Sequence, residues 1–220
     1  YRESLLDAEQ ILEFGSDHVV LATGSTWRDT GVGHWHTEPI EGLENASIYT
    51  PDDLMRGRLP KDTALIFDDE HYYMGGLLAE KLRQHDLDVT LVTPESKASF
   101  YTTNTEEHAR IQAQLIEMGV ELELNMGLES LEAGSATLAC AYTGRTRSVE
   151  AHSIVLVTSR DPEDSLYREL QDQIPITRIG DCLAPSTIAA AVYSGHRFAR
   201  EFEEPAPEGA PFKRERIGPC

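Results

Sequence analysis

The 220-residue sequence predicts an α/β fold with parallel strands, and three observations support this prediction. A strand–helix–strand pattern combines an apolar run at 64–67, helical spacing at 77–82 and a second apolar run at 88–93. Two further buried strands are expected at 18–22 and 153–158. Hydrophobic residues make up 40% of the chain, which is typical of a globular α/β protein and not of a disordered one.

The remaining elements follow from apolar spacing and from the Gly, Pro and Asx residues that end each segment. Thr50 is placed to cap a short helix within the long connection at 26–60. Helices are expected at 4–14, 51–56, 105–118, 166–171 and 188–202. Further strands are expected at 120–124, 176–179, and in a hairpin formed by 135–140 and 146–150.

The turn of the strand–helix–strand pattern departs from the glycine pattern that binds dinucleotides. In G-x-G-x-x-G, the glycines let the backbone approach a pyrophosphate at the N-terminus of the helix. Aligned on the helix, the third glycine is present as Gly75, but the first two positions are Glu70 and Tyr72. A carboxylate and a phenol ring would repel and obstruct the phosphates of NAD(P). The nicotinamide nucleotide site is therefore expected to be closed.

Net charge and cysteine content limit the classes of function. A net charge of −19 argues against a nucleic acid or an anionic membrane as partner. It would suit a partner with a basic docking face, although an acidic surface that only keeps the protein in solution is the simpler interpretation. Cys140, Cys182 and Cys220 show no C-x-x-C spacing, which is typical of reduced thiols in the cytoplasm and predicts no iron–sulfur site here. The start at Tyr1, without a methionine or a targeting segment, indicates a chain that begins inside a longer polypeptide.

Several polar or aromatic groups are assigned structural roles. His34 and His36 lie two residues apart in a Gly-rich loop without a cysteine, a pattern that favours surface or packing roles over metal binding. His71 is assigned to hydrogen bonding in preference to proton transfer. The carboxylates at 68–70 would suit a hard cation, but they lack the spaced oxygen ligands of a calcium loop, so no metal site is predicted. Phe14 ends a helix and is a candidate for docking a partner, with core packing as the alternative.

Two short motifs are typical of flavoproteins with two dinucleotide-binding domains. In those proteins a buried strand ending in Ala-Thr-Gly connects the FAD domain to the NAD domain, and the same sequence occurs here at 22–24. A Gly-Asp pair ahead of a helix closes their FAD site, where the helix N-terminus favours a nearby anion. The candidate cofactor-binding residues are therefore Ala22, Thr23, Gly24, Gly180 and Asp181.

Over essentially its whole length the sequence resembles the C-terminal half of the trimethylamine dehydrogenase family. These are iron–sulfur flavoproteins that also include dimethylamine and histamine dehydrogenases, with dienoyl-CoA reductases as more distant relatives. The loop that lacks two of the glycines and contains Tyr72-Tyr73-Met74 is particular to the amine dehydrogenases, whereas the Ala-Thr-Gly and Gly-Asp motifs are shared more widely. The resemblance rests on residues 12–24, 72–74, 78–82, 155–158, 179–181, 195–201 and 211–215.

The resemblance implies that this chain is one part of a larger enzyme whose catalytic groups lie in another part. The covalent FMN and the [4Fe–4S] cluster of the family lie in an N-terminal (β/α)₈ barrel, so this chain would contain no catalytic residue. The whole enzyme would be a homo-oligomer that oxidatively demethylates or deaminates a small amine and passes electrons to an electron-transferring flavoprotein. This portion would hold ADP or FAD. The alternatives are a stand-alone nucleotide- or protein-binding module, and an NADH-dependent flavin reductase of the dienoyl-CoA reductase type.

The resemblance also implies two intertwined, three-layer, Rossmann-like domains. The FAD/ADP-binding-like domain would comprise residues 1–62 and 159–220, and the NAD(P)-binding-like domain of residues 63–158 would be inserted in it. The FAD-like domain is expected to be incomplete, because its own glycine loop would lie upstream of Tyr1. Thr158-Ser159-Arg160 also replaces the Thr-Gly-Arg of reductase relatives.

Overall fold

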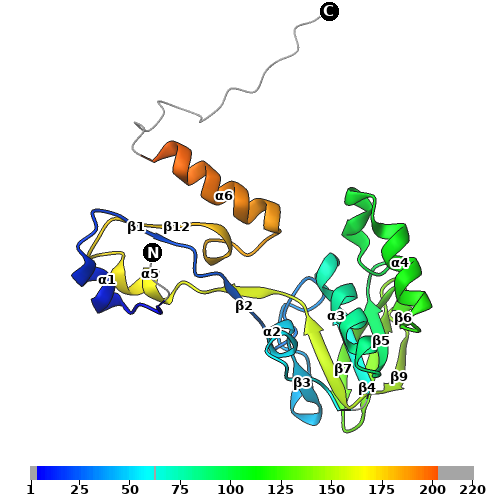
Figure 1. Ribbon diagram of the computed structural model, residues 1–220. Helices are drawn as coiled ribbons and strands as arrows, with labels where there is room; N and C mark the ends of the chain where they lie inside the picture. The colour runs from blue at the N-terminus through cyan, green and yellow to red at the C-terminus, as the bar shows by residue number, and fades with distance from the viewer. Residues whose placement is uncertain (1–3, 62, 203–220) are drawn as a thin grey trace, which may run out of the picture. The chain divides into compact units, whose positions relative to one another are not determined.

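The computed structural model describes residues 4–61 and 63–202, and the chain divides into two units (Figure 1). The inner unit is the continuous segment 25–161, and the outer unit combines residues 1–24 with 162–220. One unit is therefore inserted in the sequence of the other, with boundaries at 24/25 and 161/162, whereas the sequence prediction placed them at 62/63 and 158/159. Residues 25–61 lie in the inner unit because β3 (Ser47–Tyr49) pairs with β10 (Ser153–Val157) in its sheet.

The inner unit is built on a five-stranded parallel sheet in the order β3-β10-β4-β5-β6. Its other strands are β4 (Thr63–Asp68), β5 (Asp88–Thr93) and β6 (Glu121–Leu124). Residues 64–68 of β4 are all buried, as the apolar run in the sequence predicts for a strand covered on both faces. The mixed α/β class with a parallel sheet is confirmed.

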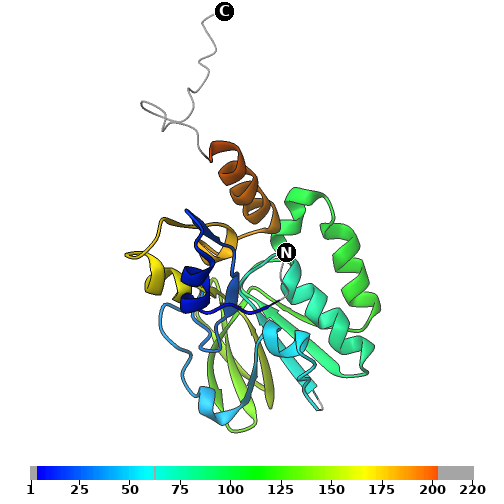
Figure 2. The ribbon, with the colours of Figure 1, turned by 60° about the vertical axis from the view of Figure 1, so that its left-hand side comes forward.

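Two different layers cover the faces of this sheet, as Figure 2 shows. On one face, Ala64 and Ile66 of β4 pack in a core with α3 (Tyr73–Gln84), α4 (His108–Glu117) and α2 (Pro51–Met55). On the other face, Leu65 and Phe67 pack against an antiparallel sheet of β7 (Met126–Glu132), β8 (Ser135–Cys140) and β9 (Thr146–Glu150). The alternation along β4 follows from the period of two in a strand. Each fully buried aliphatic side chain contributes about 1.5–3 kcal/mol to stability.

The short helix α2 begins where the sequence predicts. Thr50 is its N-cap: its side chain accepts from the Asp53 N–H, while the Asp53 carboxylate accepts from the Thr50 N–H at 2.9 Å. Pro51 occupies the first helical position, where its missing N–H costs nothing. The predicted cap is therefore confirmed.

The outer unit has a much smaller core. Its strands β1 (Val19–Leu21) and β12 (Ile176–Arg178) form a two-stranded parallel sheet, and its helices are α1 (Ala8–Phe14), α5 (Ser165–Leu170) and α6 (Ile188–Glu201). Among its described residues, those buried are Leu21, Leu170 and Cys182. Helices α1 and α6 bury no residue, and Ile188 of α6 is 83% exposed.

Most predicted elements are found close to their expected bounds. The helix expected at 4–14 begins only at Ala8, because Asp7 caps it. The 105–118 helix begins at His108, because a 3₁₀ turn (Phe100–Thr105) precedes it. The sequence analysis missed β7, β3 and the two-stranded sheet of β2 (Ser25–Trp27) and β11 (Arg160–Pro162). A further 3₁₀ turn spans Leu43–Asn45. Residues 211–215, which carry part of the resemblance, lie outside the described residues. None of the described helices is long and apolar enough to cross a membrane.

Candidate functional site

The carboxyl ends of three parallel strands meet where the order of the inner sheet reverses. From β4 the chain continues to β5 and β6 on one side, and it returns to β10 on the other side of β4. Ligands of open α/β sheets bind at such a switch point. Asp68 ends β4, Thr93 ends β5 and Thr158 follows β10.

The backbone N–H groups of the loop after β4 are satisfied by acceptors in the loop itself, in β4 and in β10. Asp69 and Glu70 donate from their backbones to the Val157 carbonyl, at 2.9 and 3.1 Å. The His71 N–H donates to Asp68 Oδ1 at 3.0 Å, and the Tyr72 N–H donates to Glu70 Oε2 at 3.1 Å. In a phosphate-binding loop, such N–H groups point at the ligand. Here four consecutive groups are bonded within the inner unit.

The Glu70 carboxylate lies at the N-terminus of α3, the position that an anion favours. Burial raises the pKa of Glu70, while its bonds with the Tyr72 and Met74 N–H groups and the charge of Arg160 oppose the shift. The ring of Tyr72 packs against that of Tyr73, with centroids 4.2 Å apart. The structure thus places both non-glycine positions of the loop at the start of α3.

Gly75 lets α3 approach β4 closely. A Cβ at this position would lie 2.5 Å from the Cγ and Oδ2 atoms of Asp68, and 2.8 Å from its Cβ. A Cβ at the next position, Gly76, would lie 2.8 Å from Ser99 Oγ. Helix–strand packing is the role of the third glycine in the dinucleotide pattern, so the residue is used for packing although the loop before it is closed.

A group of polar side chains is buried beside this loop. Asp69 Oδ2 accepts from the backbone N–H groups of His34 and Trp35, which fixes the Gly-rich loop against β4. His34 Nδ1 lies 2.8 Å from the Asp69 carbonyl oxygen, and His71 Nε2 lies 3.5 Å from Asp69 Oδ1. His71 Nδ1 lies 3.3 Å from Thr93 Oγ1. The rings of His34 and His71 are stacked, with centroids 5.8 Å apart.

Burial and neighbouring groups shift the pKa values of Asp68 and His71. Burial raises the pKa of Asp68 to about 6, against the opposing effect of its bond from the His71 N–H. Burial lowers the pKa of His71, but its bond with Asp69 and the charge of Asp68 outweigh that effect and raise it overall. The sequence analysis considered His34, His71 and Asp69 separately and missed this cluster, because the Gly-rich loop lies 35 residues from β4.

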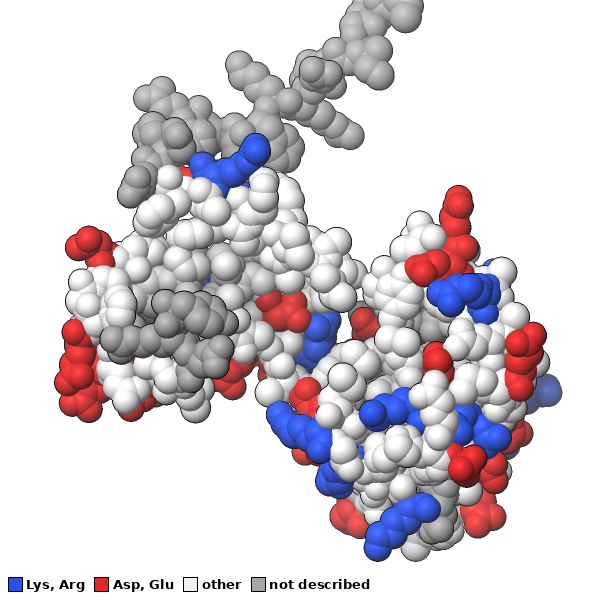
Figure 3. All heavy atoms as spheres, in the orientation of Figure 1, with Lys and Arg blue, Asp and Glu red and all other residues white. Residues whose placement is uncertain are grey.

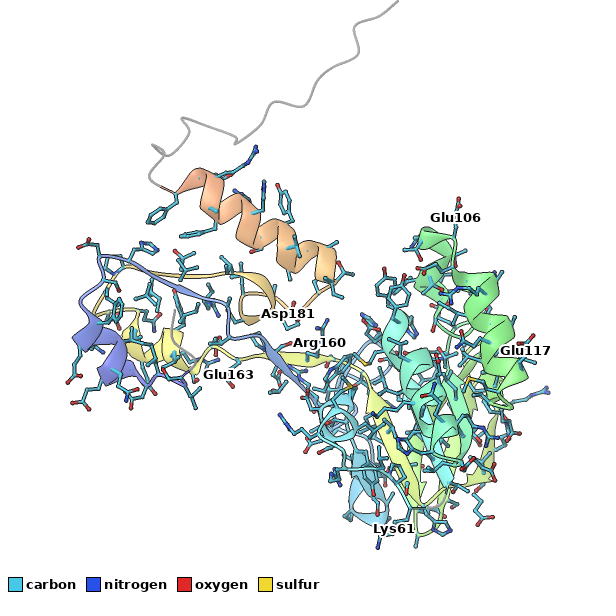
Figure 4. The ribbon with its side chains drawn as sticks, in the orientation of Figure 1. Lys61, Glu106, Glu117, Arg160, Glu163 and Asp181 are labelled. Atoms are coloured by element: carbon cyan, nitrogen blue, oxygen red, sulfur yellow. The ribbon has the colours of Figure 1, made fainter. Side chains whose placement is uncertain are left out.

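The two flavoprotein motifs come together in the outer unit. Because β1 and β12 are parallel neighbours, residues 22–24 and 180–181 follow the same edge of the two-stranded sheet, and the Ile179 N–H donates to the Leu21 carbonyl at 2.9 Å. Gly180 has a φ of 62°, and its N–H donates to Ser194 Oγ of α6 at 3.0 Å. Asp181, which Figure 4 labels just before α6, accepts from the Ser186 N–H at 3.3 Å.

The first of these motifs is tied to the returning chain. Thr23 Oγ1 donates to the Glu163 carbonyl, and the Glu163 N–H donates to the Gly24 carbonyl at 3.0 Å. Ala22 and Thr23 are exposed, and a Cβ at Gly24, whose φ is 83°, would meet no atom within 4 Å. The described part of the outer unit contributes no glycine-rich loop to these residues.

Phe14 lies at the exposed end of α1. Its side chain is 64% exposed and borders a groove of about 560 Å³ that is also lined by residues 4–6, 10 and 13. Acidic side chains gather at the end of the outer unit that carries α1 (Figure 3).

Comparisons with known proteins find enzymes that oxidise amines. No protein-family model matches the chain. Dimethylamine dehydrogenase from Hyphomicrobium sp. (strain x) is 33% identical over 97% of the chain. The structure of histamine dehydrogenase from Rhizobium sp. 4-9 superimposes with a TM-score of 0.92 at 38% identity, again over 97% of the chain. The structure of 6-hydroxypseudooxynicotine amine oxidase from Pseudomonas geniculata N1 covers 92% of the chain, with a TM-score of 0.89 and 34% identity.

The chain spans about one third of each relative: 33%, 35% and 31% of their respective lengths. Dimethylamine and histamine dehydrogenases are members of the trimethylamine dehydrogenase family, which the sequence was found to resemble. The chain is thus a homologue of the trimethylamine dehydrogenase family of oxidoreductase flavoproteins and corresponds to its C-terminal portion.

Proposed function

We propose that the chain is the C-terminal portion of an amine dehydrogenase that depends on FMN and a [4Fe–4S] cluster. The whole enzyme oxidatively demethylates or deaminates a small amine in the cytoplasm and passes the electrons to an electron-transferring flavoprotein. The observation that carries this proposal is the match to histamine dehydrogenase over 97% of the chain, at 38% identity and a TM-score of 0.92.

The described residues support a non-catalytic role for this portion. The FMN, the iron–sulfur cluster and the substrate pocket belong to the (β/α)₈ barrel of the same polypeptide, which this portion packs against and supports. The small core of the outer unit and the exposed apolar face of α6, which includes Ile188, Val192 and Tyr193, fit a unit that is completed by other segments of the enzyme.

The outer unit supplies half of a site for ADP or FAD. Residues 22–24 and the pair Gly180 and Asp181, which follow the same edge of the β1–β12 sheet, both contact the nucleotide. The phosphate cradle is contributed by the glycine loop of the upstream part of the same domain. Phe14 and the acidic surface near it contribute to the docking face, and the whole enzyme is a homo-oligomer.

The closed loop of the inner unit argues against direct exchange with a nicotinamide nucleotide. A pyrophosphate would need the N–H groups of residues 69–72, and all four are bonded to Val157, Asp68 or Glu70. It would also have to displace a carboxylate from the N-terminus of α3. The NADH-dependent flavin reductase alternative requires this loop to be open.

Anaerobic reduction of the full-length protein from its native gene tests the proposal. Dimethylamine and histamine, the amines in the names of two relatives, are each mixed with the enzyme, and flavin absorbance is followed. We expect at least one small amine to bleach the flavin, an electron-transferring flavoprotein to reoxidise it, and NAD+ to have no effect. Rapid flavin reduction by NADH would support the flavin reductase instead. A native polypeptide of only these 220 residues, without flavin, would support the stand-alone binding module.

A further inference from the structure

Four buried oxygen atoms at the switch point of the inner sheet have no hydrogen-bond partner among the described residues. They belong to Asp68 (Oδ2), Asp69 (Oδ1), Ser99 (Oγ) and Thr158 (Oγ1). The large majority of buried side-chain polar atoms in proteins have such a partner, so four unpartnered oxygens in this region require an explanation. An ion or ordered water is the usual one.

Three of the neighbouring side chains offer donor atoms that converge. One ligand atom each from His34, Asp69 and His71 lies within 4.8 Å of the others. Asp69 is fully buried, and its Oδ1 atom is one of the four atoms without a hydrogen-bond partner; His71 Nε2 lies 3.5 Å from it. The other oxygen of Asp69 is bound to two backbone N–H groups, which hold the carboxylate in place.

The Nδ1 hydrogen bonds of both imidazoles leave their Nε2 atoms available to an ion. His34 Nδ1 faces the Asp69 carbonyl, which can only accept, so a neutral His34 carries its proton on Nδ1 and its lone pair on Nε2. His71 Nδ1 faces Thr93 Oγ1, which also accepts from the Glu95 N–H. Bonding of the second ring nitrogen to an oxygen is what orients histidine ligands in metal sites.

We propose that His34, Asp69 and His71 bind a divalent first-row transition metal ion, with zinc as the representative ion. Two imidazoles and one carboxylate, with a fourth position for water or a further oxygen, form a recognised ligand set for such ions. Magnesium and calcium prefer all-oxygen sites and are not expected here. The ion would offset the charges of Asp68 and Asp69 and would tie the Gly-rich loop to the end of β4.

Binding requires the cluster to close. Two donors that share a tetrahedral ion at about 2.1 Å lie about 3.4 Å apart, so a 4.8 Å separation must shorten by about 1.4 Å. His34 is exposed, whereas Asp69 and His71 are buried, so its ring is the one with room to rotate. A direct ion pair between His71 and Asp69 is the arrangement that would occupy the site without a metal.

The test is zinc binding by the full-length protein after chelator treatment. Zinc is titrated by competition with a chromophoric chelator, zinc per polypeptide is measured by mass spectrometry, and the zinc X-ray absorption edge reports the ligands. We expect one zinc per polypeptide, with imidazole and oxygen ligands at about 2.0–2.2 Å. The His34→Ala variant, which removes one imidazole, should weaken zinc binding at least tenfold. The Asp69→Asn variant, which removes the carboxylate, should weaken it to a similar extent. The matched control, His85→Ala, alters another exposed histidine of the inner unit and should bind like the wild type.

Circular dichroism of each variant shows whether it is folded, and His34→Ala removes an exposed side chain that the core does not need. Zinc that binds equally to the wild type and to folded His34→Ala would overturn the proposal. So would sulfur ligation at about 2.3 Å, which would place the ion on a cysteine. A wild-type protein that binds no zinc would show that the His71–Asp69 pair alone fills the site. The outcome does not depend on amine dehydrogenase activity.

Discussion

Replacing Asp68 by asparagine should change how the stability of the inner unit depends on pH. The carboxyl group is fully buried, and burial raises its pKa from 3.8 to about 6. Because the pKa is higher in the folded state, the folded state holds the proton more tightly than the unfolded state does. The resulting stabilisation is fully present below pH 3.8 and is lost as the pH rises through about 6.

The magnitude follows from these two pKa values. Each pH unit between them corresponds to about 1.4 kcal/mol, so the loss across the window is about 3 kcal/mol. Asparagine cannot ionise, and its side-chain oxygen can still accept from the His71 N–H. We therefore expect the unfolding free energy of Asp68→Asn, relative to the wild type, to increase by about 2–3 kcal/mol between pH 4 and pH 7.5.

Urea denaturation at a series of pH values, in the presence of a chelator, measures this difference. Both tryptophans of the chain, Trp27 and Trp35, lie in the inner unit, so their fluorescence reports its unfolding. Asp53 provides a control whose pKa is shifted in the opposite direction, because its bond with Arg58 lowers that pKa to about 2. The stability that it contributes is present above pH 3.8 and is lost as the pH falls through about 2. Asp53→Asn should thus cost about 1–2 kcal/mol at every pH from 4 to 7.5, allowing for solvent screening at the half-exposed Arg58.

A constant difference between Asp68→Asn and the wild type over this range would refute the reasoning. It would mean that Asp68 has the same proton affinity in the folded and unfolded states. A difference that falls with pH would show that the carboxylate is stabilised by its surroundings, in conflict with its burial.

Two substitutions test the local packing of the inner unit. Gly75→Ala should destabilise it by about 1–3 kcal/mol, since the new Cβ would lie 2.5 Å from the Asp68 carboxyl carbon. The control Gly195→Ala, whose Cβ would have no neighbour nearer than 3.7 Å, should be tolerated. Equal shifts in the melting temperatures of the two variants would show that the clash at Gly75 has no effect. Thr50→Ala should lower the free energy of unfolding by about 1 kcal/mol, because it removes the side chain that accepts from the Asp53 N–H and caps α2. An unchanged midpoint in urea denaturation would show that the cap contributes nothing to stability.

The elements that the sequence predicted are those whose signals are local. The parallel strands β4 and β5 show buried apolar runs, and the β8–β9 hairpin has its turn within the sequence. Strand β7 was missed because its pattern is interrupted: the register shifts between Leu128 and Ser130. At Gly127 a Cβ would clash with the ring of Trp35, so this strand lies directly against the Gly-rich loop, a contact that no local pattern encodes.

The closed loop was predictable from adjacent residues, but its hydrogen bonds and the cluster beside it were not. Glu70 and Tyr72 stand in glycine positions, and a comparison with the glycine pattern is enough to find them. The acceptor for two of the loop's N–H groups is Val157, which is 87 and 88 residues away in the sequence and is brought close only by the β4–β10 pairing. His34 and Asp69 likewise meet through the packing of the Gly-rich loop on β4.

These long-range bonds imply that restoring the glycine pattern alone should not restore nucleotide binding. In the double variant Glu70→Gly and Tyr72→Gly, the carboxylate and the ring that obstruct a phosphate are removed. The backbone N–H groups of residues 69 and 70 would still donate to Val157, and that of His71 would still donate to Asp68. A pyrophosphate would have to break these bonds, each of which contributes about 0.5–1.5 kcal/mol in its present place. Fluorescence titration with NADPH should therefore detect no binding to the double variant. Submillimolar binding would show that the two side chains alone keep the site closed and that the backbone of the loop is already able to hold a phosphate.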